Sequence, residues 1–426
     1  MLCLIIPAKR LNEWRLQNRV KYEILKKRQI RKKKMAKIFK APLFSKKIYL
    51  IALYGAFLSI STQMLYSHLA LFLKFECNIS DVQIASIDGF VEFLSYLIRI
   101  FAGAVSDYLY DRKLLLVVGC SIVVAIKPIF ALTHSVFTVV FSEILERLGN
   151  GIQASPRDAL IADLSSQSKL GASFGFCKSL KTIGSILGSI IALSIIWISS
   201  NNYRLLFILS SIPAICALFY VSRIKNTSVK LSVDIKKFDN PFKKKYLKSM
   251  DEDFWKIIIL AFVCESGHFA ESLFTLKSTQ FFSQTLSGMT SVFAAFGQIF
   301  FSYFIGIASD KINRITLLKI NLAFLLLAYT SMFFGMSGIA FLLGVSVICG
   351  QYAALQLLFL SMINLRVSAN LRGTAIGIFY CAIGAAYMLS TNVCGFLCNN
   401  FGYEASFLYA LVISLVSMTI IYRFKN

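Results

Sequence analysis

Apolar residues occupy this sequence in long uninterrupted runs that are separated by short polar stretches. Most runs hold roughly 20 or more residues, enough for a helix to cross a hydrocarbon core of about 30 Å. The runs do not alternate between apolar and polar positions, which excludes a membrane barrel. We therefore predict an all-α polytopic membrane protein with twelve transmembrane helices, at about 48–73, 84–105, 114–133, 135–158, 170–198, 204–222, 254–276, 287–308, 315–335, 338–364, 373–396 and 403–422.

Positive charge is concentrated in two polar segments outside these runs. The chain is 57% hydrophobic, yet its net charge is +24. Residues 1–47 hold sixteen Lys and Arg against two acids, and residues 223–248 hold nine against two, which leaves +21 in the two segments. Basic segments beside membrane helices are typical of the cytoplasmic side. This location argues against nucleic-acid binding as the origin of the charge.

The polar stretch 223–253 divides the predicted helices six and six. We expect four parts: a basic cytoplasmic N-terminal segment at 1–47, a six-helix bundle at 48–222, a cytoplasmic linker at 223–253 and a second six-helix bundle at 254–426. The opening MLCLIIPAKR has no cleavable signal pattern. Met35 offers an alternative start, which would make residues 1–34 a dispensable extension.

The Lys and Arg of the short loops fall on one side of the predicted topology, and the opposite loops hold fewer. With positive charge inside, both termini are cytoplasmic. We expect a monomeric, multi-pass protein of a bacterial inner membrane. The ten cysteines are scattered without disulfide or metal spacing, so they are expected to be small core residues.

The two halves of the chain repeat each other. GAVSD at 103–107 returns as GIASD at 306–310, and GASFG at 171–175 returns as GTAIG at 373–377. His68 and His268 lie 200 residues apart, and each is followed two residues later by Ala. Matches at nearly one offset, each on the equivalent span, predict two pseudo-symmetric bundles with the same orientation, which is a transporter architecture.

These motifs resemble the major facilitator superfamily. Its loop between spans two and three reads G-x-x-x-D-R-x-G-R-[RK], and this chain matches it at Gly103, Asp107, Arg112 and Lys113. The chain departs from the pattern because Tyr108 and Asp111 replace the first Arg and the Gly. STQMLYSHLALFL in span one and ERLGNGIQASPRDALIAD at 146–163 are similar to a poorly characterised bacterial subgroup of that superfamily.

The resemblance implies a cytoplasmic gate. Asp107, and by repeat Asp310, would lie against the start of a helix in the other half, where free N–H groups favour a carboxylate. The charges around Pro156 form a gate network with Arg112 or are ordinary interfacial charge. The expected gate residues are Gly103, Asp107, Arg112, Lys113, Arg157, Asp158, Asp163, Asp310 and Arg314.

Span four carries charge inside an apolar run. Glu143 and Arg147 are spaced i,i+4 with the acid first, the orientation that pairs best along a helix, so they can neutralise each other. Glu146 lies on a neighbouring face and needs another partner, because a lone charge in the bundle costs on the order of 3 kcal/mol or more. The candidate partners are Arg99, Lys178 and Lys181. Gly149 and Gly151 are expected to allow close helix packing.

Span two carries Asp88 and Glu92 one turn apart, and Lys127 in span three lies at a similar depth. Either one acid forms a structural pair with Lys127, or a carboxylate takes up and releases a proton during a transport cycle. The proton-coupling or substrate candidates of the chain are Glu265, His268, Glu271, His68, Asp88, Glu92, Glu146 and Arg147.

Span seven contains ESGHFAES, in which Glu265, His268 and Glu271 step by three. On one continuous helix they lie within about 120° of a single face. A proton relay or a substrate-facing acid is the preferred interpretation, because in the resembling superfamily this span lines the cavity. A divalent metal site is the alternative, but no fourth ligand stands at recognisable spacing, so we expect no metal. His68 is placed to occupy the matching position on span one.

Gly175, Gly184 and Gly188 in span five match part of the superfamily's antiporter motif, but Ser189 stands where that motif has Pro. Without that Pro the motif lacks the residue that kinks the helix, which argues against export by antiport and leaves import and export as alternatives. The sequence has no HExxH, GxSxG or Walker loop, so we expect neither enzyme activity nor a cofactor.

Together these features predict a secondary transporter that moves a small organic solute by alternating access, coupled to protons. Without a nucleotide-binding segment, its energy must come from an ion gradient or from the solute's own gradient. The alternative from another class is a non-transporting membrane receptor or scaffold that retains the transporter fold. The buried acids argue against a scaffold, which has no reason to bear their cost.

Overall fold

The computed structural model describes residues 45–109, 111–133, 135–165, 170–224, 250–309, 311–367 and 372–423. Within these ranges all regular secondary structure is helical, which confirms the predicted all-α class. Residues 1–44 and 225–249, which hold most of the basic N-terminal segment and of the linker, lie outside the described residues.

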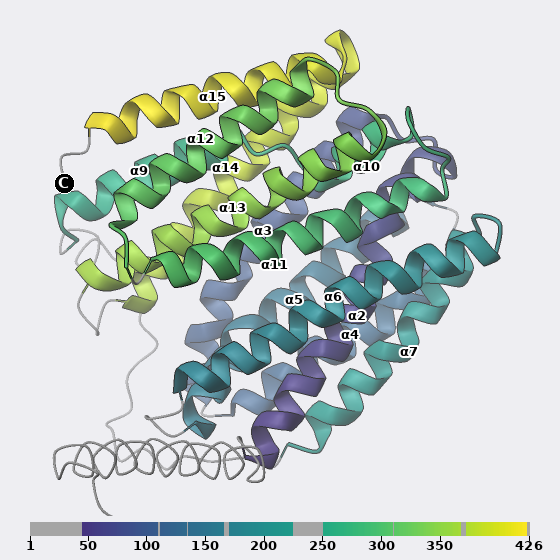
Figure 1. Ribbon diagram of the computed structural model, residues 1–426. Helices are drawn as coiled ribbons and strands as arrows, with labels where there is room; N and C mark the ends of the chain where they lie inside the picture. The colour runs from purple at the N-terminus through teal and green to yellow at the C-terminus, as the bar shows by residue number, and fades with distance from the viewer. Residues whose placement is uncertain are drawn as a thin grey trace, which may run out of the picture. The chain divides into compact units, whose positions relative to one another are not determined.

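The helices follow the predicted apolar runs within a few residues at most ends (Figure 1). In chain order they are α2 (Lys46–Phe75), α3 (Asp81–Leu109), α4 (Arg112–Leu132), α5 (Val136–Leu164), α6 (Leu170–Ile198), α7 (Tyr203–Ser222), α9 (Glu252–Glu265), α10 (Glu271–Ser278), the short 3₁₀ turn η2 (Leu286–Gly288), α11 (Met289–Ala308), α12 (Arg314–Phe333), α13 (Gly338–Arg366), α14 (Arg372–Phe401) and α15 (Tyr403–Arg423).

Short polar side chains mark where several helices begin. Asp111 accepts a hydrogen bond from the Leu114 N–H at the start of α4, and Asn202 does the same for Leu205 at the start of α7. Asn313 accepts from the Ile315 N–H at the start of α12. Each side chain satisfies a backbone donor that the first helical turn leaves unpaired. The apolar runs therefore begin as helices at these residues.

Nine helices in the described ranges are long and apolar enough to cross a membrane: α2, α4, α6, α7 and α11 to α15. The other two long helices, α3 and α5, contain 29 residues each but carry the acids and arginines of spans two and four. Several long apolar helices make this chain a multi-pass membrane protein, because only structures that satisfy their own backbone hydrogen bonds cross lipid.

The prediction of one continuous helix at 254–276 is wrong. α9 ends at Glu265 and α10 begins at Glu271, so residues 266–270 interrupt the span. Glu265, His268 and Glu271 therefore do not form one face of a single helix. Ser266 and Gly267, which have poor helix propensity, lie at the interruption. Neighbouring side chains form hydrogen bonds with the backbone groups that no longer pair within a helix.

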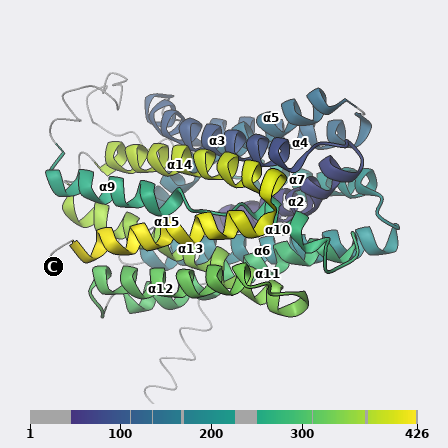
Figure 2. The same ribbon diagram turned by 90° about the horizontal axis from the view of Figure 1, so that it is seen from above.

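Helices that are distant in sequence lie side by side. α3 packs along α14, which joins the predicted second and eleventh spans, and α6 contacts α11 (Figure 2). α4 packs against α5 and α7, while α12 packs against α13 and α15. Gly149 fits this packing, because a Cβ there would lie 2.9 Å from the Gly119 carbonyl oxygen. The expected packing roles of Gly149 and Gly151 agree with these contacts.

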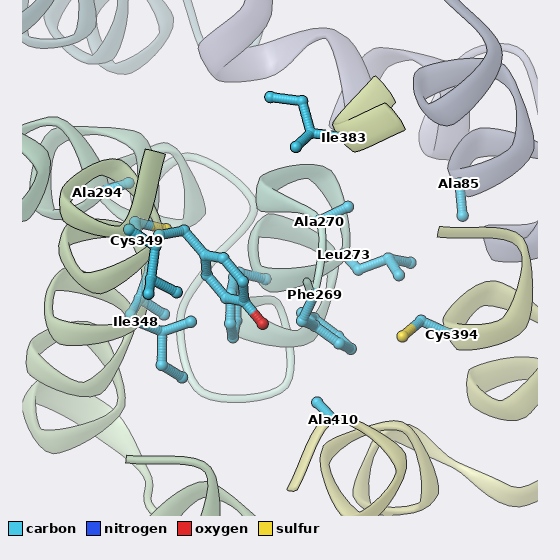
Figure 3. Packing of buried hydrophobic residues seen from close by; sticks show 14 of the residues in the cluster. Ala85, Phe269, Ala270, Leu273, Ala294, Ile348, Cys349, Ile383, Cys394 and Ala410 are labelled. Atoms are coloured by element: carbon cyan, nitrogen blue, oxygen red, sulfur yellow. The ribbon is translucent and has the colours of Figure 1, made fainter. Parts of the chain in front are cut away.

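The interrupted span lies inside the hydrophobic core. Phe269 and Leu273 are wholly buried, as are Ile348 on α13 and Cys394 on α14. Figure 3 shows Phe269 and Leu273 among side chains of these neighbours, with Ala410 of α15 close by. The core therefore fixes residues 266–270 from several sides, which holds the nearby polar residues in place.

Candidate functional site

Two carboxylates on α3 hold Arg147 of α5. Its NH1 lies 2.7 Å from Glu92 Oε2, and its NH2 lies 3.9 Å from Asp88 Oδ1. Glu143 and Arg147, expected to neutralise each other, interact through their charges, but the ion pairs of Arg147 are with the two acids of α3, which packs against α5. The side chains of Arg147, Asp88 and Glu92 are 22%, 18% and 17% exposed, so each keeps a small part of its surface accessible.

A third helix contributes an aromatic face. The guanidinium carbon of Arg147 lies 3.9 Å from the centre of the Tyr66 ring of α2, within cation–π distance. The Arg147 Nε is buried without a hydrogen-bond partner. Arg147 is thus fixed by its charge partners at one end of the guanidinium and by Tyr66 across its plane.

Asp88 connects this group to distant parts of the chain. Its Oδ2 accepts hydrogen bonds from the Ser272 hydroxyl of α10 at 2.9 Å and from the Tyr387 hydroxyl of α14 at 3.3 Å. The other oxygen, Oδ1, faces Arg147. We call Tyr66, Asp88, Glu92, Arg147, Ser272 and Tyr387 the central cluster. One carboxylate in this cluster therefore holds groups from both halves of the sequence.

A separate ion pair lies between α4 and α5. Lys127 Nζ lies 2.7 Å from Glu146 Oε1, and both side chains are completely buried. Lys127 also donates to the Ser61 carbonyl oxygen of α2 at 3.2 Å. The structural pairing of Lys127 with Asp88 or Glu92 is wrong. So are Arg99, Lys178 and Lys181 as partners of Glu146, because the packing of α4 on α5 brings Lys127 and Glu146 together.

Side chains satisfy the backbone of the interrupted span. The Phe269 N–H donates to the Tyr329 hydroxyl at 3.2 Å, and that hydroxyl lies 3.1 Å from the Gly267 carbonyl oxygen. The Tyr409 hydroxyl donates to the Ser266 carbonyl oxygen at 2.8 Å, and Ser390 donates to that of His268 at 3.0 Å. Non-helical backbone at membrane depth needs such partners, since lipid offers none.

His268 lies in this non-helical stretch between an acid and two tyrosines. Its Nδ1 lies 2.7 Å from Glu265 Oε1. Its ring stacks on Tyr352 with 3.8 Å between centres and meets Tyr387 edge-on at 5.1 Å. Because Tyr387 also hydrogen-bonds Asp88, His268 adjoins the central cluster.

Glu271 opens α10, one residue before Ser272. The charges of Asp88, Arg147 and His268 act on its carboxylate. An acid in the first turn of a helix is favoured by the free N–H groups there. The structure therefore brings most of the predicted candidates, Asp88, Glu92, Arg147, His268 and Glu271, into one electrostatic group, although not through the predicted helix face.

Comparisons with known proteins give the family. The family model described as Major Facilitator Superfamily matches residues 51–356 and 269–426. The chain belongs to the Major Facilitator Superfamily. An uncharacterised MFS-type transporter of Methanocaldococcus jannaschii is 24% identical over 397 residues, which cover 88% of this chain and 93% of that protein. The chain is thus a membrane transporter by family.

Solved structures share the fold of this superfamily member. The match to a D-xylose–proton symporter covers 89% of this chain and 97% of the symporter chain, with 16% sequence identity and a TM-score of 0.71. The match to the D323A mutant of the nucleoside transporter NupG covers 89% of this chain and 100% of the NupG chain, with 12% sequence identity and a TM-score of 0.76. At these identities the likeness shows the fold alone.

The expected gate residues of this superfamily member form several local contacts. Arg112 NH1 lies 2.7 Å from Asp163 Oδ2, and Arg157 lies 3.1 Å from its neighbour Asp158. Lys113 donates to the Ser222 carbonyl oxygen, and Arg314 donates to the Ser361 hydroxyl. Gly103 packs on Ser155, where an added Cβ would lie 2.6 Å from its hydroxyl. Asp310 and the side chain of Asp107 lie outside the described residues.

The two histidines related by the sequence repeat differ in surroundings. His68 is completely buried within continuous α2, with Ser67 Oγ 2.9 Å from its Nδ1. Its Nε2 has no hydrogen-bond partner and faces Gly288, where an added Cβ would lie 2.2 Å away. His68 therefore packs beside η2, while His268 adjoins the central cluster. In the described ranges no group of three or more His, Cys, Asp or Glu side chains is arranged to hold a metal ion.

Sequence reasoning missed Tyr66, Ser272, Tyr352 and Tyr387. A tyrosine or serine within an apolar run carries no formal charge, so these residues gave a weaker signal than the acids. Their roles depend on how each helix is rotated toward its neighbours. This rotation cannot be predicted from the local sequence of one helix. The sequence also did not predict that Tyr66 of α2 lies close to Glu143 and Arg147 of α5.

Proposed function

We propose that this transporter moves a small organic solute by alternating access and couples that movement to protons. In this proposal residues 48–222 and 254–426 form two six-helix bundles, with α9 and α10 counted as one interrupted span. Both termini are cytoplasmic in a cell inner membrane, and the protein works as a monomer. The basic segment at 1–47 and the linker at 223–253 lie on the cytoplasmic side.

The observation that carries the proposal is the position of Asp88. It faces Arg147 within one proposed bundle and accepts hydrogen bonds from Ser272 and Tyr387 of the other. A proton on this carboxylate would weaken its attraction for Arg147 and its strength as an acceptor. Protonation would therefore change the strength of the contacts within one bundle relative to those between the two bundles. Alternating access requires two states whose relative free energies can be shifted in this way.

Asp88, Glu92, Glu265 and Glu271 are the proton-coupling candidates in this scheme. They share the electrostatic group around Arg147 and His268. Glu146 is assigned a structural role instead, because Lys127 neutralises it away from any exposed surface. The fold is also that of a D-xylose–proton symporter, which shows that such an architecture serves proton-linked transport elsewhere.

The interrupted span supports a solute site at the same depth. Residues 266–270 leave the helix beside the central cluster, and discontinuous helices in transporters commonly form substrate sites near the bilayer midplane. Tyr329, Tyr409 and Ser390 fix this stretch, so His268 and Ser272 are presented in defined positions.

The Arg112–Asp163 pair, with Gly103, Asp107, Lys113, Arg157, Asp158, Asp310 and Arg314, is assigned to the cytoplasmic gate. Arg112 and Asp163 belong to the same proposed bundle, and their side chains are 22% and 28% exposed. Partly exposed ion pairs are weak, so this pair can exchange partners more readily than the buried Lys127–Glu146 pair.

The test begins with a search for the solute. Metabolites and antibiotics are screened for a rise in the thermal stability of the purified full chain, since a ligand that binds only the folded protein stabilises it. Uptake of each hit is then measured in reconstituted vesicles with and without an imposed pH gradient. The proposal expects accumulation driven by the gradient. A protein inert to every solute and gradient would instead support the receptor or scaffold.

A further inference from the structure

We propose that the solute is a monovalent organic cation with an apolar body, bound at the central cluster. This inference rests on the proposed transport function and names its substrate class. It follows from the excess of acids around Arg147, from the buried Glu143 oxygen that has no hydrogen-bond partner, and from the aromatic rings beside the acids.

Acids outnumber bases in this region. Six carboxylates act on one another or on Arg147, Lys127 and His268: Asp88, Glu92, Glu143, Glu146, Glu265 and Glu271. Lys127 and Arg147 offset two of them through contacts of 2.7 Å. The charge of Arg99 also acts on Glu92. If all six carboxylates are ionised, these three bases leave three negative charges, which protons or a bound cation must compensate.

Glu143 shows where a partner is missing. Its residue is only 3% exposed, and its Oε2 has no hydrogen-bond partner. It precedes Arg147 by four residues on α5, so it lies on the helix face that Arg147 turns to α3. The charges of Asp88, Arg147 and Glu92 act on it. A buried carboxylate oxygen in this position is costly unless a cation or a proton compensates it.

The surrounding rings suit a cation. Tyr66 already carries a guanidinium over its face at 3.9 Å, which shows that this surface accepts positive charge. Across the cluster, His268 and Tyr352 stack on each other and Tyr387 meets His268 edge-on. Aromatic rings beside carboxylates offer an apolar body both contact area and charge compensation.

An anionic solute fits less well. Arg147 is the basic residue of the central cluster, and its guanidinium is held by Glu92, Asp88 and Tyr66. An anion would have to displace two acids from it and would meet Glu271 and Glu143 nearby. Like charges at such a site disfavour binding, so the cation is the occupant that the geometry selects.

The test uses two ions of the same shape and opposite charge. Binding of tetraphenylphosphonium and of tetraphenylborate to the purified full chain is measured by equilibrium dialysis, with tetrapropylammonium as a smaller cation. We expect saturable binding of at least one cation, and at least tenfold weaker binding of tetraphenylborate. Equal binding of both tetraphenyl ions, preference for the borate, or no binding of either cation would overturn the proposal.

Variants locate the site. Glu143→Gln and Asp88→Asn should each weaken cation binding at least tenfold, whereas Asp88→Glu, which keeps the charge, should retain most of it. Glu252→Gln is the matched control, because Glu252 is 82% exposed on α9 and pairs with nearby Lys256. Size-exclusion profiles confirm that each variant is folded. Unchanged binding in both Glu143→Gln and Asp88→Asn would overturn the assignment to the central cluster.

Failure of the substrate class and failure of the transport function have different signatures. Gradient-driven accumulation of a neutral or anionic solute, without binding of either cation, would remove the cation class and keep the transport function. Saturable cation binding that depends on Asp88, without accumulation of any solute, would support the binding site and remove transport.

Discussion

Lys127 and Glu146 form an ion pair in which Nζ and Oε1 are 2.7 Å apart and neither side chain has any exposed surface. The pair joins α4 to α5, and the Ser61 carbonyl oxygen of α2 accepts a further hydrogen bond from Lys127. Glu146 directly precedes Arg147 on α5. The ion pair therefore also fixes the rotation of α5 beside the central cluster. A stable α5 is needed for Arg147 to face α3.

Lys127→Met should destabilise the protein by about 3–5 kcal/mol, because removal of one partner leaves a buried charge uncompensated. Unfolding of the detergent-solubilised chain in guanidinium chloride, followed by tryptophan fluorescence, measures the loss. The double variant Lys127→Met with Glu146→Leu is the control and should recover most of the stability. A single variant as stable as the parent would contradict a structural role for the pair.

Hydropathy predicted most of the fold because helix length and apolar composition are local properties. Leu170–Ile198 and Tyr203–Ser222 agree with the predicted spans within a residue. The interruption after Glu265 could not be predicted in the same way. It depends on Tyr329, Tyr409 and Ser390, which lie far away in sequence and satisfy the freed backbone.

The candidate site was predicted as a set of residues but not as a set of contacts. Buried acids and bases are costly in lipid, so Asp88, Glu92, Glu146 and Arg147 stood out from their apolar surroundings. Their partners depend on which helices touch and on how each is rotated. The i,i+4 rule therefore paired Arg147 with Glu143, whereas packing of α3 on α5 gave it Glu92.

Tyr329→Phe should destabilise the protein by about 1–3 kcal/mol, since it leaves the buried Phe269 N–H and the Gly267 carbonyl oxygen without this partner. The same unfolding assay measures the change. Tyr303→Phe is the matched control, because Tyr303 is 63% exposed and should be nearly neutral. Equal stability of the two variants would show that the hydroxyl does not support the interruption.

Gly297→Ala should destabilise the contact of α11 with α13, because its Cβ would lie 1.8 Å from the Ser346 carbonyl oxygen. Overpacking of this kind costs about 1–3 kcal/mol when helices shift to relieve it. Gly306→Ala, on the same helix with nothing within 4 Å of its Cβ, should be neutral or slightly stabilising. Comparable melting temperatures for both variants would contradict the close packing.

Cross-linking tests movement between the proposed bundles. The Thr285 hydroxyl donates to Asn201 Oδ1 at 2.8 Å, which joins the loop before α7 to the loop before η2. In a cysteine-free background, Asn201→Cys with Thr285→Cys, joined by a short bifunctional thiol reagent, should abolish uptake. Glu76→Cys with Arg204→Cys is the control within one bundle, since these residues are 3.6 Å apart, and its cross-link should leave uptake intact. Uptake that survives the first cross-link would argue against alternating access.

Proton movement tests the central claim most directly. Vesicles containing a trapped pH-sensitive dye are given the solute found in the stability screen, without an imposed gradient. The account predicts that the parent chain and Glu252→Gln change the internal pH as solute enters, and that at least one of Asp88→Asn, Glu92→Gln, Glu265→Gln and Glu271→Gln abolishes this change. Solute uptake by the parent chain with no change in internal pH, or proton movement that persists unchanged in all four variants, would contradict it.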